Sequence, residues 1–357
     1  MRHLLLALTA LLLACVPARG GDEAPTAPPA AEASPSAPSP DAFDELLRVD
    51  APVTDGFSSP VGEGWKVYDL EDQPCVYYEG LCEPIEPPWC SVSASCWERK
   101  EPAVVRAPAA GVVVERSERH ITIRTQYYEN HERRIISTAL IGLTPAVALG
   151  ATVSRGQPLG SSNRLSVYAN VHPMTLPAAF FATHPSTPVP QAEPTLVLIQ
   201  HDSYTMRIYQ NGVATGTYNV SFGQEAGVKE RRGDNRTPKG VYYVIARSLG
   251  PFDGPYGEYY GGHWIKLNYP NAYDAARGVD QGLITPAQQV SISRAWRARQ
   301  PTLGDTALGG GIGLHGWARE WEDDGPRHLS WGCVVLHLEG VGEIYDSIPQ
   351  SAMVILF

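Results

Sequence analysis

Apolar and polar positions divide the chain into segments of different structure. The first apolar stretch runs from Leu4 to Ala14 and is broken only by Thr9. It is too short to cross a membrane as a helix, and its length is that of the apolar core of an export signal. From Val16 to about Pro40 the residues are mostly Pro, Ala, Ser and Gly. This composition predicts an extended tether that cannot bury a core of its own.

Two β-rich regions follow the tether. Between residues 102 and 170, short runs of β-branched residues alternate with Gly and Pro, which predicts a small all-β module. The last region opens with the apolar run 195–200 and continues as a hairpin around Asn211-Gly212, a pair that favours positive φ. Residues 353–357 predict a final strand.

Two helices are predicted inside this last region. Thr285 and Gln288 have the spacing of a capping box, and Pro286 between them suits the first helical position. Apolar residues at helical spacing follow, so we expect a helix over 286–299. A second amphipathic pattern covers 338–348 and ends at a proline, which cannot continue a helix.

Charge and cysteine content narrow the class of protein. Charged residues make up 18% of the chain and the net charge is −10, which argues against nucleic acid and against an anionic membrane surface as partners. Of six cysteines, Cys75, Cys82, Cys90 and Cys96 lie close together among Pro, Trp and Tyr. In an exported chain they predict two disulfides with the pairing open. A zinc site is the alternative, although no Cys-x-x-Cys pair is present.

Cys15 ends the first apolar stretch, in the run Leu12-Leu13-Ala14-Cys15. This run resembles the lipoprotein box of bacteria, and the resemblance implies that Cys15 becomes the lipidated first residue of the mature protein. The alternative is an ordinary signal peptide cut near Ala18. No acidic residue follows Cys15 directly, which by the same resemblance implies an exported, periplasmic protein anchored in the outer membrane.

The sixth cysteine, Cys333, is the candidate nucleophile. His315-Gly316 and Ser330-Trp331-Gly332-Cys333 lie at the ends of two short apolar segments, so the imidazole and the thiol can meet. A thiol beside an imidazole loses its proton more readily, and the thiolate is the nucleophile. Gly332 leaves room for a substrate carbonyl, and amides at this turn would bind an oxyanion. The alternative is an inert buried cysteine beside a core histidine.

A longer motif series gives these residues a family context. The run Gly233-Asp234-Asn235-Arg236-Thr237-Pro238-Lys239-Gly240 follows the hairpin, and His315-Gly316 and the cysteine turn come after it. Together they resemble the L,D-transpeptidase catalytic domain, whose pattern is G-D-x-x-T-P-x-G, then His-Gly, then Ser-His-Gly-Cys. The resemblance covers 195–357 and implies a mainly β domain, a β-sandwich with a few helices.

The same resemblance implies a reaction that needs no cofactor. Cys333 would attack the carbonyl of the third residue of a peptidoglycan tetrapeptide stem, D-alanine would leave, and a thioester would form. His315 would move the proton, Gly332 would lie at the oxyanion, and Ser330 would orient the site. Trp331, Gly316 and Arg236 are the expected substrate contacts.

Two positions depart from the family pattern. Trp331 stands where the family usually has a second His, which would make that wall of the site more apolar and larger. Val335 stands where many members have an Arg that helps to recognise a charged group. The sequence leaves open which of four basic residues compensates: Arg236, Lys266, Arg319 or Arg327.

The middle module has a resemblance of its own. The phrases Ala107-Pro108-Ala109-Ala110-Gly111-Val112 and Gly156-Gln157-Pro158-Leu159-Gly160 resemble the small β barrel-sandwich core of the lysostaphin-type zinc endopeptidases, and lipoyl carriers share part of this pattern. The family's zinc-binding His-x-His pair is replaced by Arg164-Leu165-Ser166. We therefore expect a degenerate module without metal or hydrolase activity, with a scaffolding or wall-binding role.

The sequence thus predicts an exported L,D-transpeptidase with peptidoglycan stem peptides as partners. The acceptor would be an amine on a second stem or a lysine on an outer-membrane lipoprotein. One alternative is a carboxypeptidase or amidase that uses water, and another is a non-catalytic wall-binding lipoprotein. The predicted divisions are a signal peptide (1–14), a lipidated tether (15–60), a disulfide segment (61–99), the β module (100–172), a linker (173–194) and the catalytic domain (195–357).

Overall fold

The structure is a computed structural model. It describes residues 40–49, 51–68, 75–78, 81–84, 90, 95–170, 189–254, 257–324 and 327–357. The predicted signal peptide, Cys15, residues 15–39 of the tether and residues 173–188 of the linker lie outside the described residues. Within the described ranges, no helix has both the length and the apolar character needed to cross a membrane.

A short helix and three short strands precede the first large sheet. They are α1 (Pro40–Leu47), β1 (Lys66–Tyr68), β2 (Cys75–Tyr78) and β3 (Leu81–Pro84). Phe43 and Leu46 lie on one face of α1 and are buried in an apolar cluster with Leu196 and Met353. The tether predicted over 15–60 is therefore wrong at its C-terminal end, because this amphipathic helix has an apolar face to bury.

One disulfide pairing is defined. Cys90 and Cys96 are bonded, with their Cα atoms 6.1 Å apart, and both residues are buried. This confirms a disulfide in the cysteine-rich segment. The side chains of Cys75 and Cys82 lie outside the described residues, although their strands β2 and β3 form an antiparallel pair.

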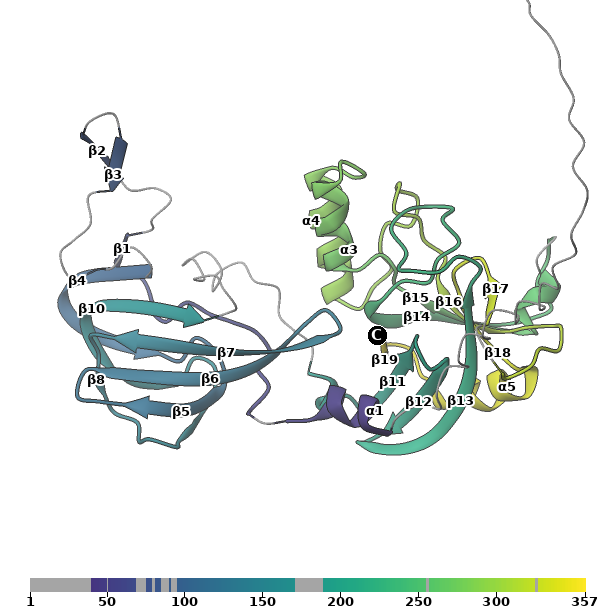
Figure 1. Cartoon of the computed structure of the whole chain (residues 1–357), viewed down its shortest axis with the longest axis horizontal. Helices are drawn as coiled ribbons and strands as arrows, with labels where there is room; N and C mark the ends of the chain where they lie inside the picture. The colour runs from purple at the N-terminus through teal and green to yellow at the C-terminus, as the bar shows by residue number, and fades with distance from the viewer. Residues whose placement is uncertain are drawn as a thin grey trace, which may run out of the picture. The chain divides into compact units, whose positions relative to one another are not determined.

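The middle module is an antiparallel sheet, as the β-rich runs predicted. Besides β1, its strands are β4 (Ser95–Arg106), β5 (Gly111–Arg116), β6 (His120–Glu129), β7 (Glu132–Ile141), β8 (Thr144–Pro145), β9 (Thr152–Val153) and β10 (Pro158–Asn170). The order is β1-β4-β10-β7-β6-β5-β9, and β8 pairs with β10 (Figure 1). In the ranges listed above, no three His, Cys, Asp or Glu side chains lie together as a metal site would require. The kinship with lysostaphin-type enzymes stays a prediction.

The C-terminal region is built from nine strands. They are β11 (Thr195–Gln200), β12 (Thr205–Gln210), β13 (Val213–Gly223), β14 (Gly240–Leu249), β15 (His263–Leu267), β16 (Gly313–Gly316), β17 (His328–Ser330), β18 (Val334–Leu336) and β19 (Met353–Leu356). Their order is β12-β11-β19-β14-β15-β16-β18-β13-β17, and β12 also pairs with β13. The mainly β prediction is confirmed, and this last pairing closes the strands into a barrel-like ring instead of an open sandwich.

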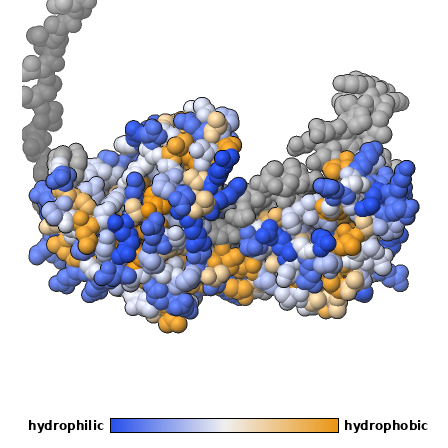
Figure 2. All heavy atoms as spheres, turned by 180° about the vertical axis from the view of Figure 1, so that it is seen from behind, coloured by the Kyte–Doolittle hydropathy of each residue, from blue (hydrophilic) through white to orange (hydrophobic). Residues whose placement is uncertain are grey.

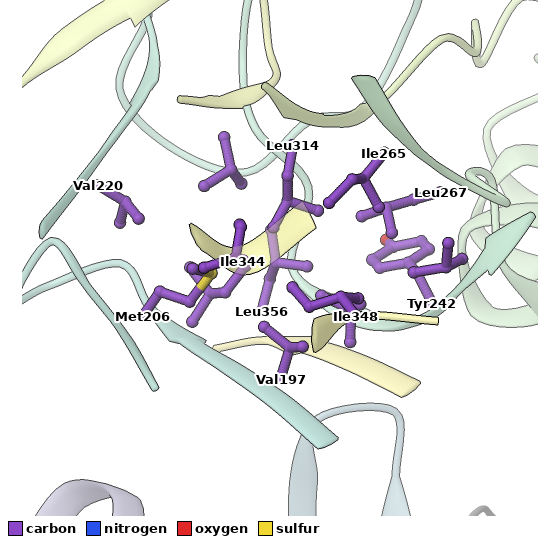
Figure 3. Close-up of a cluster of buried hydrophobic side chains, with 14 of the residues drawn as sticks. Val197, Met206, Val220, Tyr242, Ile265, Leu267, Leu314, Ile344, Ile348 and Leu356 are labelled. Atoms are coloured by element: carbon purple, nitrogen blue, oxygen red, sulfur yellow. The ribbon is translucent and has the colours of Figure 1, made fainter. Parts of the chain in front are cut away.

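Apolar residues from most of these strands fill the ring. Val197, Ile265, Leu314 and Leu356 are fully buried, and Ile344 joins them from a helix that covers one side. Figure 3 shows these side chains converging in one cluster. Because β16 and β18 carry the two candidate catalytic motifs, this core also supports the strands that present them.

Helices lie between and after the strands. They are the 3-10 turns η2 (Pro190–Ala192) and η3 (Gly257–Tyr260) and the helices α3 (Ala272–Asp280), α4 (Pro286–Arg297) and α5 (Leu338–Ser347). The predicted capping box of Thr285 and Gln288 begins α4 as expected. Helix α3 was not predicted, although Asn271 and Asp274 form a capping box at its start.

The visible surface is of mixed character. On the face drawn in Figure 2, hydrophobic residues lie in small groups among hydrophilic ones. The large apolar side chains that are exposed, such as Val104, Val213, Leu249 and Val290, belong to different elements. Isolated apolar residues are normal on a folded surface, so we turn to the interior of the C-terminal region for a site.

Candidate active site

Parallel strand pairing brings Cys333 and His315 to one face of the sheet. In the ladder between β16 and β18, His315 lies opposite Val335. Cys333 lies in the bend directly before β18, two residues ahead of Val335. The side chains of Cys333 and His315 line one cavity of about 350 Å³. The other residues around it are Gly233, Asn235, Tyr259, Tyr260, Gly311 and Trp331.

His315 is buried, with 4% of its surface exposed. Its Nδ1 lies 2.7 Å from the carbonyl oxygen of Gly316. A carbonyl only accepts, so in the neutral ring the proton belongs on Nδ1 and the basic nitrogen is Nε2. Burial lowers the pKa of His315 to about 4, although hydrogen bonds to the carbonyls of Gly316 and Tyr259 oppose the shift. The ring is therefore neutral near pH 7 and able to accept a proton.

Cys333 is a protonated thiol in the resting site. Its Sγ lies 3.5 Å from the carbonyl oxygen of Gly311, and among the cysteines whose side chains the structure describes it is the only one without a disulfide. Burial raises the pKa of this thiol to about 11, while a backbone hydrogen bond at Gly313 and the charge of Lys229 act in the opposite direction. The expectation of a thiol acidified by the imidazole is wrong for this state, because burial disfavours both charged forms.

Ser330 and Gly332 shape the turn before the thiol. The Ser330 hydroxyl donates to the carbonyl of Cys333 at 2.6 Å and accepts from the amide of Gly332 at 3.1 Å. Gly332 has φ +124°, and a Cβ there would lie 2.8 Å from the carbonyl oxygen of Arg236. Ser330 thus holds the turn through both hydrogen bonds, and its part in catalysis stays a prediction. The amide of Gly332 was predicted to bind an oxyanion, but the structure shows it already bonded to Ser330.

Trp331 lies at the cavity and is 45% exposed. Its ring packs edge-on against Tyr259 at 5.6 Å and beside Trp317 at 6.4 Å between centroids. The ring of Tyr260 lies 4.9 Å from that of His315 in a T-shaped arrangement. The wall that Trp331 joins is therefore aromatic, in line with the apolar wall expected from this substitution.

Two further residues, Gly316 and Arg236, were predicted as substrate contacts, and neither lines the cavity. Gly316 does not line the cavity, but its carbonyl orients the ring of His315. Arg236 does not line it either, because its guanidinium turns toward Gly227 while its backbone carbonyl faces Gly332. Arg236 is therefore wrong as a cavity contact.

The loop that carries Asn235 reaches the cavity instead. Asn235 adopts a left-handed conformation with φ 54°. Next to it, Asp234 forms a buried ion pair of 2.8 Å with Lys229 and accepts the amides of Glu230 and Arg231. These bonds hold the loop in place, so that Gly233 and Asn235 line the cavity that also contains Cys333.

Sequence reasoning missed Asn235, Tyr259 and Tyr260. Asn235 belongs to the Gly-Asp motif, but the motif does not indicate which of the motif's residues has its side chain at the cavity around Cys333. Tyr259 and Tyr260 were harder to identify from the sequence. They form an aromatic pair before Gly261-Gly262, in a segment without helix or strand periodicity. The short turn η3 brings them beside β16.

One family model matches the C-terminal region. Residues 194–356 match the YkuD family model, which describes an L,D-transpeptidase catalytic domain. This confirms the resemblance given by the Gly-Asp, His-Gly and Gly-Cys motifs. A search of curated proteins found no match to the chain.

Several solved structures are similar to part of this chain at low identity. Bd1075 of Bdellovibrio bacteriovorus has 19% identity and a TM-score of 0.31, over 46% of this chain and 48% of that one. The helical cell shape determining protein Pgp2 of Campylobacter jejuni has 20% identity and a TM-score of 0.31, over 46% and 47%. The catalytic domain of an Enterococcus faecium L,D-transpeptidase has 15% identity and a TM-score of 0.26, over 46% and 98%. This chain spans about half the length of the first two, and we infer no activity from these likenesses.

Proposed function

We propose that this protein, whose residues 194–356 match the L,D-transpeptidase family, transfers an acyl group from a peptidoglycan tetrapeptide stem to an amine. The observation that carries the proposal is the placement of Cys333 and His315 on one face of two paired strands, around one cavity. A nucleophile, a neutral base and a cavity between them are the parts that acyl transfer requires.

The first step would load the donor. As Cys333 Sγ attacks the carbonyl carbon of the third stem residue, a diaminopimelate, its proton passes to His315. The new S–C bond forms, the C–N bond to D-alanine breaks, and His315 returns the proton to the leaving amine. Because both groups are neutral at rest, proton transfer accompanies the attack instead of preceding it.

The second step would unload the thioester. An acceptor amine attacks the carbonyl, the C–S bond breaks, and the thiol recovers its proton. A stem amine as acceptor gives a 3–3 cross-link, and a lysine of an outer-membrane lipoprotein gives an anchored protein. Water as acceptor would make the same site a carboxypeptidase.

The proposal includes export and lipidation of Cys15. Its support is the apolar stretch and the lipoprotein box in the sequence, together with the disulfide between Cys90 and Cys96. Metabolic labelling with a fatty acid should mark the wild-type chain and not Cys15→Ala, with both found outside the cytoplasm. Labelling of Cys15→Ala would contradict this assignment.

The test of the reaction uses the full chain and a disaccharide tetrapeptide. Intact-protein mass spectrometry should detect a stem lacking D-alanine attached to Cys333, and chromatography should detect cross-linked dimers. Cys333→Ala should abolish both. His315→Gln should slow adduct formation by two orders of magnitude or more, whereas the control His337→Gln, at a half-buried histidine that does not line the cavity, should not.

The outcomes separate the candidate functions. Tripeptide without dimers would indicate hydrolysis. An adduct that persists in Cys333→Ala, or a folded wild-type chain that forms neither adduct nor product, would refute the proposed enzyme and favour a wall-binding protein.

A further inference from the structure

The cavity around Cys333 has no charged side chain among the described residues that line it. His315, its one ionisable base, is neutral near pH 7 because burial lowers its pKa to about 4. The donor of the proposed reaction is an anion, with one carboxylate on the terminal D-alanine and another on the diaminopimelate side chain. The chain itself carries a net charge of −10, so binding such a donor calls for a cation fixed close to the site.

Arg319 lies at the rim of this cavity. Its Nη2 donates to the hydroxyl of Tyr259 at 3.3 Å, and its guanidinium carbon lies 5.5 Å from the centroid of the same ring. Tyr259 lines the cavity and packs against Trp331. An arginine placed over an aromatic ring keeps most of its donors for a ligand while its position is restrained.

The charge of Arg319 is uncompensated within the described part of the chain. Its side chain is exposed, and no described carboxylate forms an ion pair with it. Arg327, by contrast, is buried and pairs with Asp323 at 2.8 Å. Lys229 is likewise buried and pairs with Asp234.

The other two candidate cations are placed less favourably. Arg236 turns away from the cavity toward Gly227. Lys266 lies opposite Gly313 in the ladder between β15 and β16, on the same face of the sheet as His315, but it does not line the cavity. Lys266 is therefore the competitor that an experiment has to separate from Arg319.

We propose that Arg319 binds a carboxylate of the donor stem, next to the bond that Cys333 cleaves. This deepens the proposed function and rests on it. The guanidinium offers paired donors that match a carboxylate, in a chain that has Val335 at the position where many family members carry an arginine. The two possible sources are the terminal carboxylate of D-alanine and the side-chain carboxylate of diaminopimelate.

The experiment compares three donors on the full-length protein. They are the disaccharide tetrapeptide, the same stem with a C-terminal carboxamide, and a stem with L-lysine in place of diaminopimelate. For each we would measure kcat and KM of D-amino-acid release and the rate of adduct formation at Cys333. The variants are Arg319→Ala, Arg319→Lys and Lys266→Ala, with Arg297→Ala, an exposed arginine of α4, as the control for net charge.

We expect Arg319→Ala to raise KM for the unmodified stem about tenfold with little change in kcat, and Arg319→Lys to recover part of the loss, because a point charge replaces the paired donors. The effect of Arg319→Ala should vanish with one modified donor, which identifies the carboxylate that Arg319 binds. Arg297→Ala should leave all constants unchanged.

Two results would overturn the assignment to Arg319. One is an effect of Arg319→Ala that is equal for all three donors, and the other is a loss of carboxylate preference in Lys266→Ala instead. If wild-type protein forms no adduct, the proposed reaction fails. Calorimetric binding of the unmodified stem to wild type and Arg319→Ala then decides the inference separately, and equal affinities reject it.

Discussion

The hydroxyl of Ser330 donates to the carbonyl oxygen of Cys333 at 2.6 Å, and the hydroxyl oxygen of Ser330 accepts a hydrogen bond from the amide of Gly332 at 3.1 Å. One buried side chain thus bonds to the backbone on both sides of the turn that presents the thiol. The serine acts through geometry, since its hydroxyl is engaged with the backbone.

Removing this hydroxyl should impair the enzyme more than the fold. In Ser330→Ala the buried amide of Gly332 loses its acceptor, which costs about 1–3 kcal/mol. A misplaced nucleophile should lower the rate of adduct formation at Cys333 by about 10- to 100-fold.

The matched control is Ser221→Ala. Ser221 is also fully buried on β13, and its hydroxyl has no hydrogen-bond partner among the described residues. Its loss should affect neither the rate nor, by more than a few tenths of a kcal/mol, the stability measured by urea unfolding. Equal effects of the two changes would contradict the role given to Ser330.

Gly332→Ala should combine strain with a clash. The residue has φ +124°, and its Cβ would lie 2.8 Å from the backbone oxygen of Arg236. We expect a loss of about 1–3 kcal/mol of stability and no measurable adduct. The control is Gly212→Ala, at φ +80° with open space around the added Cβ. It should lose stability through the same backbone strain, which thermal unfolding measures, but it should react normally with the donor. Normal reactivity of Gly332→Ala would show that the turn tolerates a side chain.

The protonation states at the site predict how Cys333 reacts with pH. Burial raises the pKa of its thiol to about 11 and lowers that of His315 to about 4. Alkylation by iodoacetamide, followed by mass spectrometry, should therefore rise about tenfold per pH unit from pH 7 to 10 without a plateau. In urea the thiol should titrate near its ordinary pKa of about 8.5. A plateau near neutral pH in the folded protein would reveal a thiolate–imidazolium pair instead.

His201 should make the C-terminal region sensitive to acid. Its ring stacks on Phe222 at 4.3 Å, and burial lowers its pKa to about 3. An unfolded histidine has a pKa of about 6.5, so below that pH the unfolded state binds a proton that the folded state does not. Stability therefore falls by up to about 1.4 kcal/mol per pH unit from pH 6.5 down to about 3.

Replacing this histidine should reduce the acid sensitivity. His315 contributes a similar slope down to about pH 4, so His201→Phe should roughly halve the loss between pH 6 and 4.5 while changing little at pH 8. Urea unfolding at these pH values, monitored by the fluorescence of the C-terminal tryptophans, is the measurement. An unchanged pH dependence would mean that His201 is protonated in the folded protein.

Local chemistry made much of the fold predictable. The Asn211-Gly212 turn has both residues at positive φ, and the capping box at Thr285 begins α4, because turns and caps depend on neighbouring residues. The runs of β-branched and apolar residues of strand length predicted both large sheets. Helix α1 escaped prediction because its apolar face is short and follows a Pro- and Ala-rich stretch, and its stability comes from packing against Leu196 and Met353.

The sequence by itself identified the candidate reactive pair, since the order of the Gly-Asp, His-Gly and Gly-Cys motifs singles out His315 and Cys333. Only the tertiary structure decided their charge states, the aromatic wall of Tyr259 and Trp331, the bond that occupies the Gly332 amide, and the contact of Arg319 with Tyr259. Each of these depends on which distant segments meet when the strands close, and burial and pairing across such distances leave no local pattern in the chain.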